Sequence, residues 1–303
     1  MINNFSKEIS KEILKEIKTL KIEDENYPSL LKAISKPPTP LYIKGELIKN
    51  EPCFAIVGAR RCSDYGKEIA FSIAKNLVQS GIIIVSGMAR GIDSFAHQGA
   101  IEGGGRTIAV LGTGIDEKSI YPKENIGLSR KIVAKGGCLI SEYPVGTRGL
   151  RQNFPERNRI IAGLSLGVLV VEAKIKSGAL ITARLSKIQG RKIFAVPGSI
   201  HLLNSKGPHF LIKNGAKLVE SADDILKELN FKKIKKEKGN IKGENADQDL
   251  ILKSLAQGGL RIDDIIKKTK LSAQIVSANL ALMEIEEKVK NLGANVFVLK
   301  NRP

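Results

Sequence analysis

The sequence predicts an α/β protein: an extended Rossmann-like, doubly wound and mainly parallel sheet, followed by a small winged-helix domain. Short apolar segments alternate with helical patterns through the first two thirds of the chain. These segments are β-branched and lack polar alternation, which is typical of strands buried on both faces of a parallel sheet. Near the C-terminus, three helical patterns precede a hairpin, and this order indicates a winged helix.

Residues 1–50 are expected to form a short helix and an extended lead-in. In residues 1–25, the residues Ile9, Ile13 and Ile17 recur at helical spacing, which predicts an amphipathic helix. Residues 26–50 carry Pro37, Pro38 and Pro40, so this segment is expected to lack regular structure.

Residues 51–230 are predicted to form the Rossmann-like domain. Its expected strands are 53–58, 82–86, 107–111, 138–141, 167–172 and 192–196, each separated from the next by a loop and a helical pattern. Ligands bind such sheets at the carboxyl ends of the strands, so the loops that follow these segments are the first places to look for a site.

Residues 231–246 are predicted to be a basic linker, and 247–303 the winged-helix domain. The expected elements of that domain are helices at 249–256, 262–268 and 273–286 and strands at 289–292 and 296–299. The third helix carries Glu284, Glu286 and Glu287 and no Lys or Arg before Lys288. A sequence-reading helix normally presents donors and positive charge, so a protein contact or weak DNA binding is favoured here.

The charge of the chain suggests a polyanionic partner. The formal net charge is +18, and residues 1–230 hold 34 Lys or Arg against 22 Asp or Glu. A lysine-rich genome explains the lysines equally well, but not the concentration of arginine at 148–159. No membrane insertion is expected, because no apolar run approaches the roughly 20 residues of a membrane helix. Three sparse cysteines and three scattered histidines favour a cytoplasmic protein without a metal.

The most distinctive stretch runs from Arg151 to Ile161. Arg151 and Phe154 stand just before a helical pattern, and Asn158 and Arg159 lie within it. A helix start favours a phosphate, an arginine adds charge, and an aromatic ring offers a platform for a base. The alternative is that Phe154 is core and the arginines are a solvated face, and this stretch alone leaves both interpretations open.

Loops after the predicted strands add further candidates for a phosphate-binding rim. They are Gly58, Arg60 and Arg61 after the first strand, Gly87 and Arg90 after the second, and Lys123 after the third. Glycine allows the backbone to approach a ligand, and successive amides form an anion-binding nest. Neither a dinucleotide fingerprint nor a Walker A loop is present, so no cofactor is expected.

Candidate catalysts are few. Ser86, Asp93 and His97 form a conceivable hydrolase arrangement, but Ser86 is not in a nucleophile elbow. The favoured interpretation is that Asp93 braces its loop and His97 is a half-buried side chain with its hydrogen bonds satisfied. Glu172 ends a strand, where it is suited to act as a general base or to pair with Arg159 or Arg184.

Several motifs then occur in a characteristic order. They are Ile56–Arg60, Ser86–Asp93, Tyr121–Asn125, Phe154–Gly163, Ser177–Arg184, Gln189–Arg191, Val196–Gly198 and Leu211–Ala216. Together they resemble the bacterial DNA-processing protein A family (DprA, also called Smf) over about residues 26–229. The C-terminal part is similar to the winged helix that this family often carries.

The resemblance implies a dimeric protein without enzymatic activity that binds incoming single-stranded DNA during natural transformation. It also implies that the protein protects this DNA and helps to load the RecA recombinase. Gly58, Arg60 and Lys123 match the phosphate-contacting positions of the family, and Arg151 and Phe154 match a basic position and the base-stacking ring. The chain departs from the family in its short N-terminal region and in a Gly-Ala-Arg loop where Gly-Ser-Arg is common.

The competing class is a nucleotide-processing hydrolase similar to the cytokinin-activating phosphoribohydrolases. That family resembles Pro-Gly-Gly-x-Gly-Thr followed by a glutamate. The corresponding region here, Ser177–Arg184, lacks the glutamate. Release of adenine from AMP would support this alternative.

Overall fold

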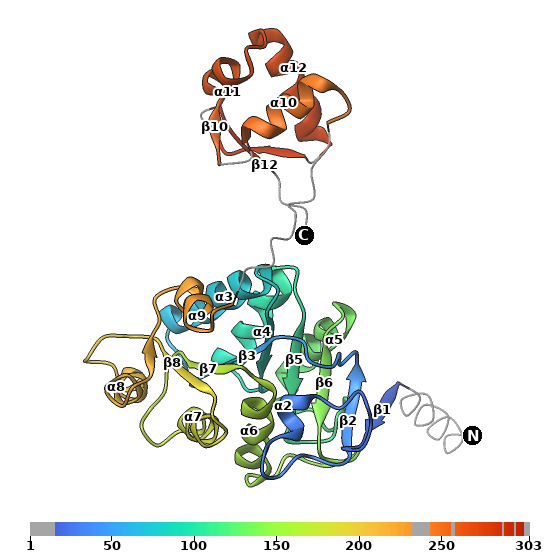
Figure 1. Cartoon of the computed structure of the whole chain (residues 1–303), viewed down its shortest axis with the longest axis vertical. Coiled ribbons are helices and arrows are strands. Elements are labelled where there is room, and N and C mark those ends of the chain that lie inside the picture. Colours follow the sequence, from blue (N-terminus) through green and yellow to red (C-terminus); the bar gives the residue numbers. More distant parts are fainter. Residues whose placement is uncertain (1–15, 232–242, 256–257, 287, 294, 300–303) are drawn as a thin grey trace. The chain divides into compact units, whose positions relative to one another are not determined.

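The computed structural model describes residues 16–231, 243–255, 258–286, 288–293 and 295–299. The chain divides into two compact units, Met1–Ile234 and Lys235–Pro303, and each unit is described by itself (Figure 1). The predicted linker at 231–246 and the predicted helix at 1–25 fall largely outside the described residues.

The described part of the first unit is built on a nine-stranded sheet, ordered β1-β2-β6-β5-β4-β3-β7-β8-β9. All neighbours are parallel except β1–β2 and β2–β6. The strands are β1 (Ile17–Leu20), β2 (Leu41–Gly45), β3 (Cys53–Val57), β4 (Ile83–Ser86), β5 (Thr107–Val110), β6 (Cys138–Ser141), β7 (Gly167–Val170), β8 (Lys192–Ala195) and β9 (Lys217–Leu218). The six strands expected in 51–230 all form.

Helices cover both faces of this sheet (Figure 1). One face packs against α3 (Asp64–Gln79), α4 (Ile92–Glu102), α5 (Ile126–Ala134) and α9 (Ala222–Glu228). The other packs against α2 (Ser29–Lys32), α6 (Asn153–Leu164), α7 (Gly178–Ile188) and α8 (Lys206–Lys213). Short 3₁₀ helices, η1 (Lys123–Asn125) and η2 (Leu203–Ser205), lie in two of the connections.

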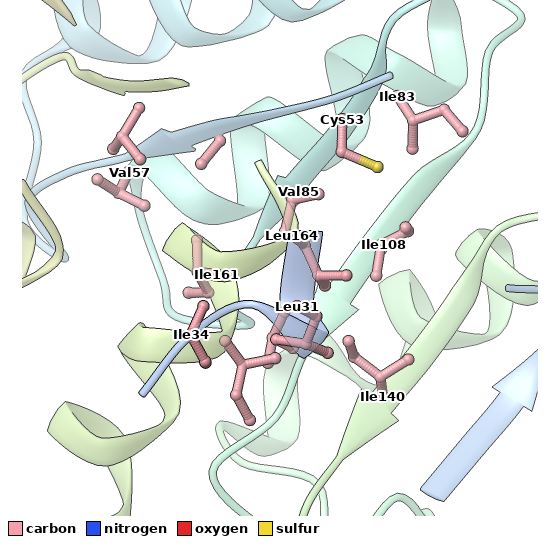
Figure 2. Packing of buried hydrophobic residues seen from close by; sticks show 14 of the residues in the cluster. Leu31, Ile34, Cys53, Val57, Ile83, Val85, Ile108, Ile140, Ile161 and Leu164 are labelled. Carbon is pink, nitrogen blue, oxygen red and sulfur yellow. The ribbon is translucent and has the colours of Figure 1, made fainter. Parts of the chain in front are cut away.

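The two cores follow from the alternation of side chains along each strand. In β3, Phe54 and Ile56 contribute to the core under α3 and α4, whereas Ala55 and Val57 contribute to the core under α6. Figure 2 shows the core under α6, where Ile161 of α6 packs near strand residues. Because every residue of β3 to β7 is buried, these strands have no polar face, and the doubly wound fold is confirmed.

The sheet has a topological switch beside β3. The chain runs from β3 through β4 and β5 to β6, and then returns to place β7 on the other side of β3. In open α/β sheets, ligands bind near the carboxyl ends of the strands at such a switch.

Within the described residues, two predictions for the N-terminal region are wrong. Residues 16–25 contain strand β1 and turns in place of a helix, and residues 26–50 contain α2 and β2. The three prolines lie before β2, which pairs with β6 from Tyr42↔Ser141 to Gly45↔Cys138. Pairing with an exposed sheet edge therefore decided the structure of β1 against its helical pattern.

The second unit contains α10 (Ala246–Leu255), β10 (Leu260–Arg261), α11 (Ile262–Thr269), α12 (Ala273–Ile285), β11 (Val289–Asn291) and β12 (Val296–Leu299). Its antiparallel sheet has the order β10-β12-β11, and Ile251, Ile265, Val276 and Phe297 belong to its core. The predicted order of three helices and a hairpin is confirmed. The two-residue strand β10 was not predicted.

Candidate nucleic-acid interface

A pocket of about 170 Å³ lies at the carboxyl edge of the sheet, over the loops that follow β3, β4 and β5. We call it the carboxyl-edge pocket. Its lining residues are Arg60, Arg61, Met88, Ala89, Arg90, Leu111, Gly112, Tyr121, Pro122, Phe154 and Arg157. Four of them are arginines and none is a carboxylate, so the pocket suits an anionic ligand.

Aromatic rings and a guanidinium meet in this pocket. The guanidinium carbon of Arg60 lies 5.5 Å from the centroid of the Phe154 ring. The ring of Tyr121 lies 5.8 Å from the same ring, centroid to centroid, at a tilt of 47°. Phe154 is only partly buried and the side chain of Tyr121 is exposed, so both rings can meet a ligand. A flat base can stack on such a ring while the guanidinium contacts its phosphate.

Helix α6 presents Phe154 from its first turn. Pro155 follows it, at a place where a missing amide hydrogen costs the helix little. Asn153 fixes this end of the helix, because its Nδ2 donates to the carbonyl of Gly112, with 3.3 Å between nitrogen and oxygen. The ring is therefore held beside the loop that follows β5.

The other charged candidates divide into two groups. Arg61 and Arg90 are exposed and line the pocket, although Arg90 is also paired with Glu124. Lys123 lies in η1, where its Nζ donates to the carbonyl of Lys118, and it does not line the pocket. Arg151 is exposed immediately before α6 and is also outside the lining.

Asn158 and Arg159 lie deeper in α6 and contact the protein. Asn158 Nδ2 donates to the carbonyl of Gly178, with 3.2 Å between nitrogen and oxygen, and this bond ties α6 to the start of α7. Arg159 forms an ion pair with Glu142. Neither residue lines the pocket, so we propose that they brace the helix that carries Phe154.

Among the lining residues that sequence reasoning did not propose for the site are Tyr121 and Arg157. Arg157 is 6% exposed, and its Nη1 donates to the carbonyl of Val110 at the end of β5. A signal for it was available, because residues three apart lie on the same face of a helix and Arg157 follows Phe154 by one turn.

Gly58 and Gly87 serve the packing around this site. A Cβ built on Gly58 would lie 2.5 Å from Cγ1 of Ile92, and one on Gly87 would lie 2.5 Å from Oδ2 of Asp93. The same Gly87 Cβ would lie 2.7 Å from both Nη atoms of Arg157. Neither glycine lines the pocket, so close packing explains both residues without a ligand.

Gly87→Ala is expected to destabilise the protein by about 1–3 kcal/mol, because the buried side chains of Asp93 and Arg157 must shift. Thermal unfolding measures the change. Gly127→Ala is the matched control, because nothing lies within 4 Å of a Cβ at that position in α5. The control should be neutral or slightly stabilising, and an equal loss in both variants would contradict the packing role of Gly87.

The suspected hydrolase arrangement is not assembled. Ser86 Oγ donates to the carbonyl of Ile56, at 2.6 Å between oxygens. His97 lies 2.7 Å from Thr107 Oγ1 through Nδ1 and 2.6 Å from the Gly87 carbonyl through Nε2. Asp93 accepts from the amide of Ala89 and thus braces its loop, as expected. His97 has satisfied hydrogen bonds as predicted, but it is fully buried, which the sequence did not indicate.

Burial lowers the pKa of His97 to about 4, against an ordinary value of about 6.5. Between these values the unfolded chain binds more protons than the folded protein, so stability falls as the pH falls. We expect this histidine to remove about 2 kcal/mol of stability between pH 7.5 and pH 5. Urea unfolding at both pH values should show that His97→Gln reduces this dependence, whereas His201→Gln, at an exposed position, should preserve it.

Glu172 has a structural role that the sequence did not reveal. Its Oε2 accepts from the amide of Ser63 at 2.9 Å, and its Oε1 accepts from the Ser63 hydroxyl. Ser63 is the N-cap of α3, so Glu172 anchors that helix to the end of β7. The predicted pairing with Arg159 or Arg184 is wrong.

Two protein-family models match this chain. Residues 18–230 match the family model of the DNA recombination-mediator protein A, and residues 236–295 match the DprA winged helix domain. The chain belongs to this family. The winged-helix prediction for the C-terminal part is therefore confirmed as well.

Curated members of the DprA family share much of this sequence. Protein Smf of Escherichia coli is 45% identical over 210 residues, which cover 69% of this chain and 56% of that protein. DNA processing protein DprA of Streptococcus pneumoniae is 44% identical over 224 residues, covering 74% of this chain and 78% of that protein. The matched part of this chain thus spans little more than half of the E. coli relative.

Solved DprA structures have the same fold. The X-ray structure of the Streptococcus pneumoniae protein matches with a TM-score of 0.65 at 42% identity, over 72% of this chain and 77% of that one. The structure of DNA processing protein A from Helicobacter pylori, described as having a unique single-stranded DNA binding mode, matches with a TM-score of 0.61 at 28% identity. That match covers 71% of this chain and 96% of the other.

None of the described helices is long and apolar enough to cross a membrane. No group of three or more described His, Cys, Asp or Glu side chains is placed to hold a metal ion.

Proposed function

We propose that this DprA-family protein binds single-stranded DNA in the carboxyl-edge pocket and acts in DNA processing during natural transformation. The observation that carries the proposal is the meeting of Arg60, Arg61 and Arg90 with the Phe154 ring in one pocket. Rim arginines contact the phosphates and Phe154 stacks on a base, so binding is largely independent of sequence. The Helicobacter pylori relative, described as binding single-stranded DNA, supports the proposal.

We also propose that the protein protects incoming DNA and helps to load the RecA recombinase, as a cytoplasmic homodimer without enzymatic activity. In this proposal Gly58 and Gly87 shape the pocket, and Lys123 and Arg151 extend its basic surface along the strand. The lining contains neither a carboxylate nor a histidine, the side chains that most often act as general acid or base, and this favours binding over hydrolysis.

A gel shift with oligo-dT and with duplex DNA, across a salt series, tests the proposal. Single strands should bind more tightly than duplex, since a base must leave the stack to reach Phe154, and affinity should fall steeply with salt. Equal binding of both forms would argue against the pocket as the binding site. Release of adenine from AMP would instead support the hydrolase alternative.

A further inference from the structure

Arg157 is a nearly buried cation that lines the carboxyl-edge pocket. It is 6% exposed, in contrast to the exposed Arg60 and Arg61 at the rim. Its Nη1 donates to the carbonyl of Val110, and its Nε donates to Asn158 Oδ1 at 3.3 Å. None of the hydrogen bonds among the described residues uses Nη2, so this nitrogen keeps two donors for a ligand.

Asp93 partly offsets the positive charge of Arg157. Burial lowers the pKa of Arg157 to about 10, and Asp93 acts against this shift, so the guanidinium remains cationic at neutral pH. Both groups lie next to the Gly87 Cα, because a Cβ there would lie 2.5 Å from Asp93 Oδ2 and 2.7 Å from both Nη atoms of Arg157. No ion pair within 4.0 Å joins them among the described residues. Asp93 therefore offsets the charge without a close ion pair.

The walls around Arg157 suit a base better than a phosphate. Met88 and Leu111 are buried apolar residues of the lining, and Pro122 and Phe154 complete an apolar and aromatic surface. A phosphate within a strand carries a sugar on each side, and the exposed rim arginines already serve it. An apolar pocket with one buried donor is the arrangement that orients a flat heterocycle.

We propose that the carboxyl-edge pocket takes one unstacked base of the DNA strand, and that Arg157 Nη2 donates to an acceptor on the edge of that base. This inference rests on the proposed function. Guanine presents two neighbouring acceptors, N7 and O6, whereas adenine places an amino donor beside N7, which would face the donor of Arg157. Binding therefore prefers guanine over adenine at one position of an otherwise freely chosen sequence.

The test uses the full chain and oligo-dT of about nine nucleotides that carries one central guanine, adenine, 2-aminopurine or abasic site. Fluorescence anisotropy measures each affinity. The guanine strand should bind roughly five- to tenfold more tightly than the adenine strand, as one good hydrogen bond allows. The 2-aminopurine strand, which lacks O6, should lose most of this advantage.

A double variant tests whether Arg157 causes the preference for guanine. Arg157→Met combined with Asp93→Asn removes both buried charges together, which limits the cost of an unpaired buried ion. This variant should bind all four strands alike, and its unfolding temperature shows whether it is folded. If it does not fold, the affinities of the unchanged protein for the guanine and 2-aminopurine strands still test whether O6 of the base is recognised.

The outcomes separate this inference from the proposed function. If the unchanged protein binds oligo-dT but binds the four strands equally, base reading is wrong while DNA binding stands. A guanine preference that persists in the folded double variant would overturn the role of Arg157. If no strand binds at all, both proposals fail.

Discussion

Replacing both Arg60 and Arg61 with alanine is expected to weaken single-strand binding by roughly 10- to 100-fold at low salt, uniformly across sequences. Both side chains are exposed and line the carboxyl-edge pocket. Each phosphate contact of a single strand contributes about −0.7 to the slope of log affinity against log salt, so the slope should flatten by about 1.4. Titrations with oligo-dT and with a mixed sequence at several salt concentrations measure both effects.

The matched control removes two charges elsewhere on the same unit. Lys131 and Lys135 are exposed at the end of α5 and do not line the pocket. Lys131→Ala with Lys135→Ala changes the net charge equally, so it should reproduce only the long-range part of the effect. Equal losses of affinity and slope in the two double variants would show that net charge, and not the pocket, attracts the strand.

Phe154→Ala is expected to weaken single-strand binding by about 5- to 150-fold, which corresponds to the 1–3 kcal/mol that stacking of one base contributes. Duplex binding should change much less, because paired bases are not available to the ring. Arg60 lies against the same ring, so part of the loss reflects a guanidinium that is no longer held in place. Filter binding with single- and double-stranded probes of equal length measures the difference.

Two conservative variants separate stacking from bulk at this position. Phe154→Tyr keeps an aromatic face and should retain most of the affinity, whereas Phe154→Leu keeps apolar volume without the ring and should resemble the alanine variant. The unfolding temperature checks that each variant retains the stability of the unchanged protein. Full affinity in Phe154→Leu would exclude a stacking role.

The central strands of the fold could be predicted because their sequence pattern reflects local burial. Cys53–Val57 and its neighbours are apolar without alternation, and such segments fit the middle of a parallel sheet. The N-terminal strands could not be predicted in this way. Ile17–Leu20 owes its strand conformation to pairing with β2, a partner that helical spacing does not reveal.

The candidate site likewise combines residues that the sequence could predict with residues that it could not. Arg60, Arg61, Arg90 and Phe154 could be expected together, because the loops after parallel strands meet at one edge of the sheet. The contact of Tyr121 with Phe154 and the burial of Arg157 depend on packing between distant segments. Lys123 belongs to the same motif as Tyr121, but its ammonium donates to the Lys118 carbonyl and it does not line the pocket, which charge alone does not predict.

The central claim is that a DNA strand occupies the carboxyl-edge pocket. Photocrosslinking of oligo-dT with one 5-bromodeoxyuridine, followed by mass spectrometry of the linked peptides, tests it most directly. We predict crosslinks at Phe154 or Tyr121, the two aromatic residues that line the pocket. Crosslinks confined to α11 or α12 of the winged-helix unit, with none at either ring, would contradict it.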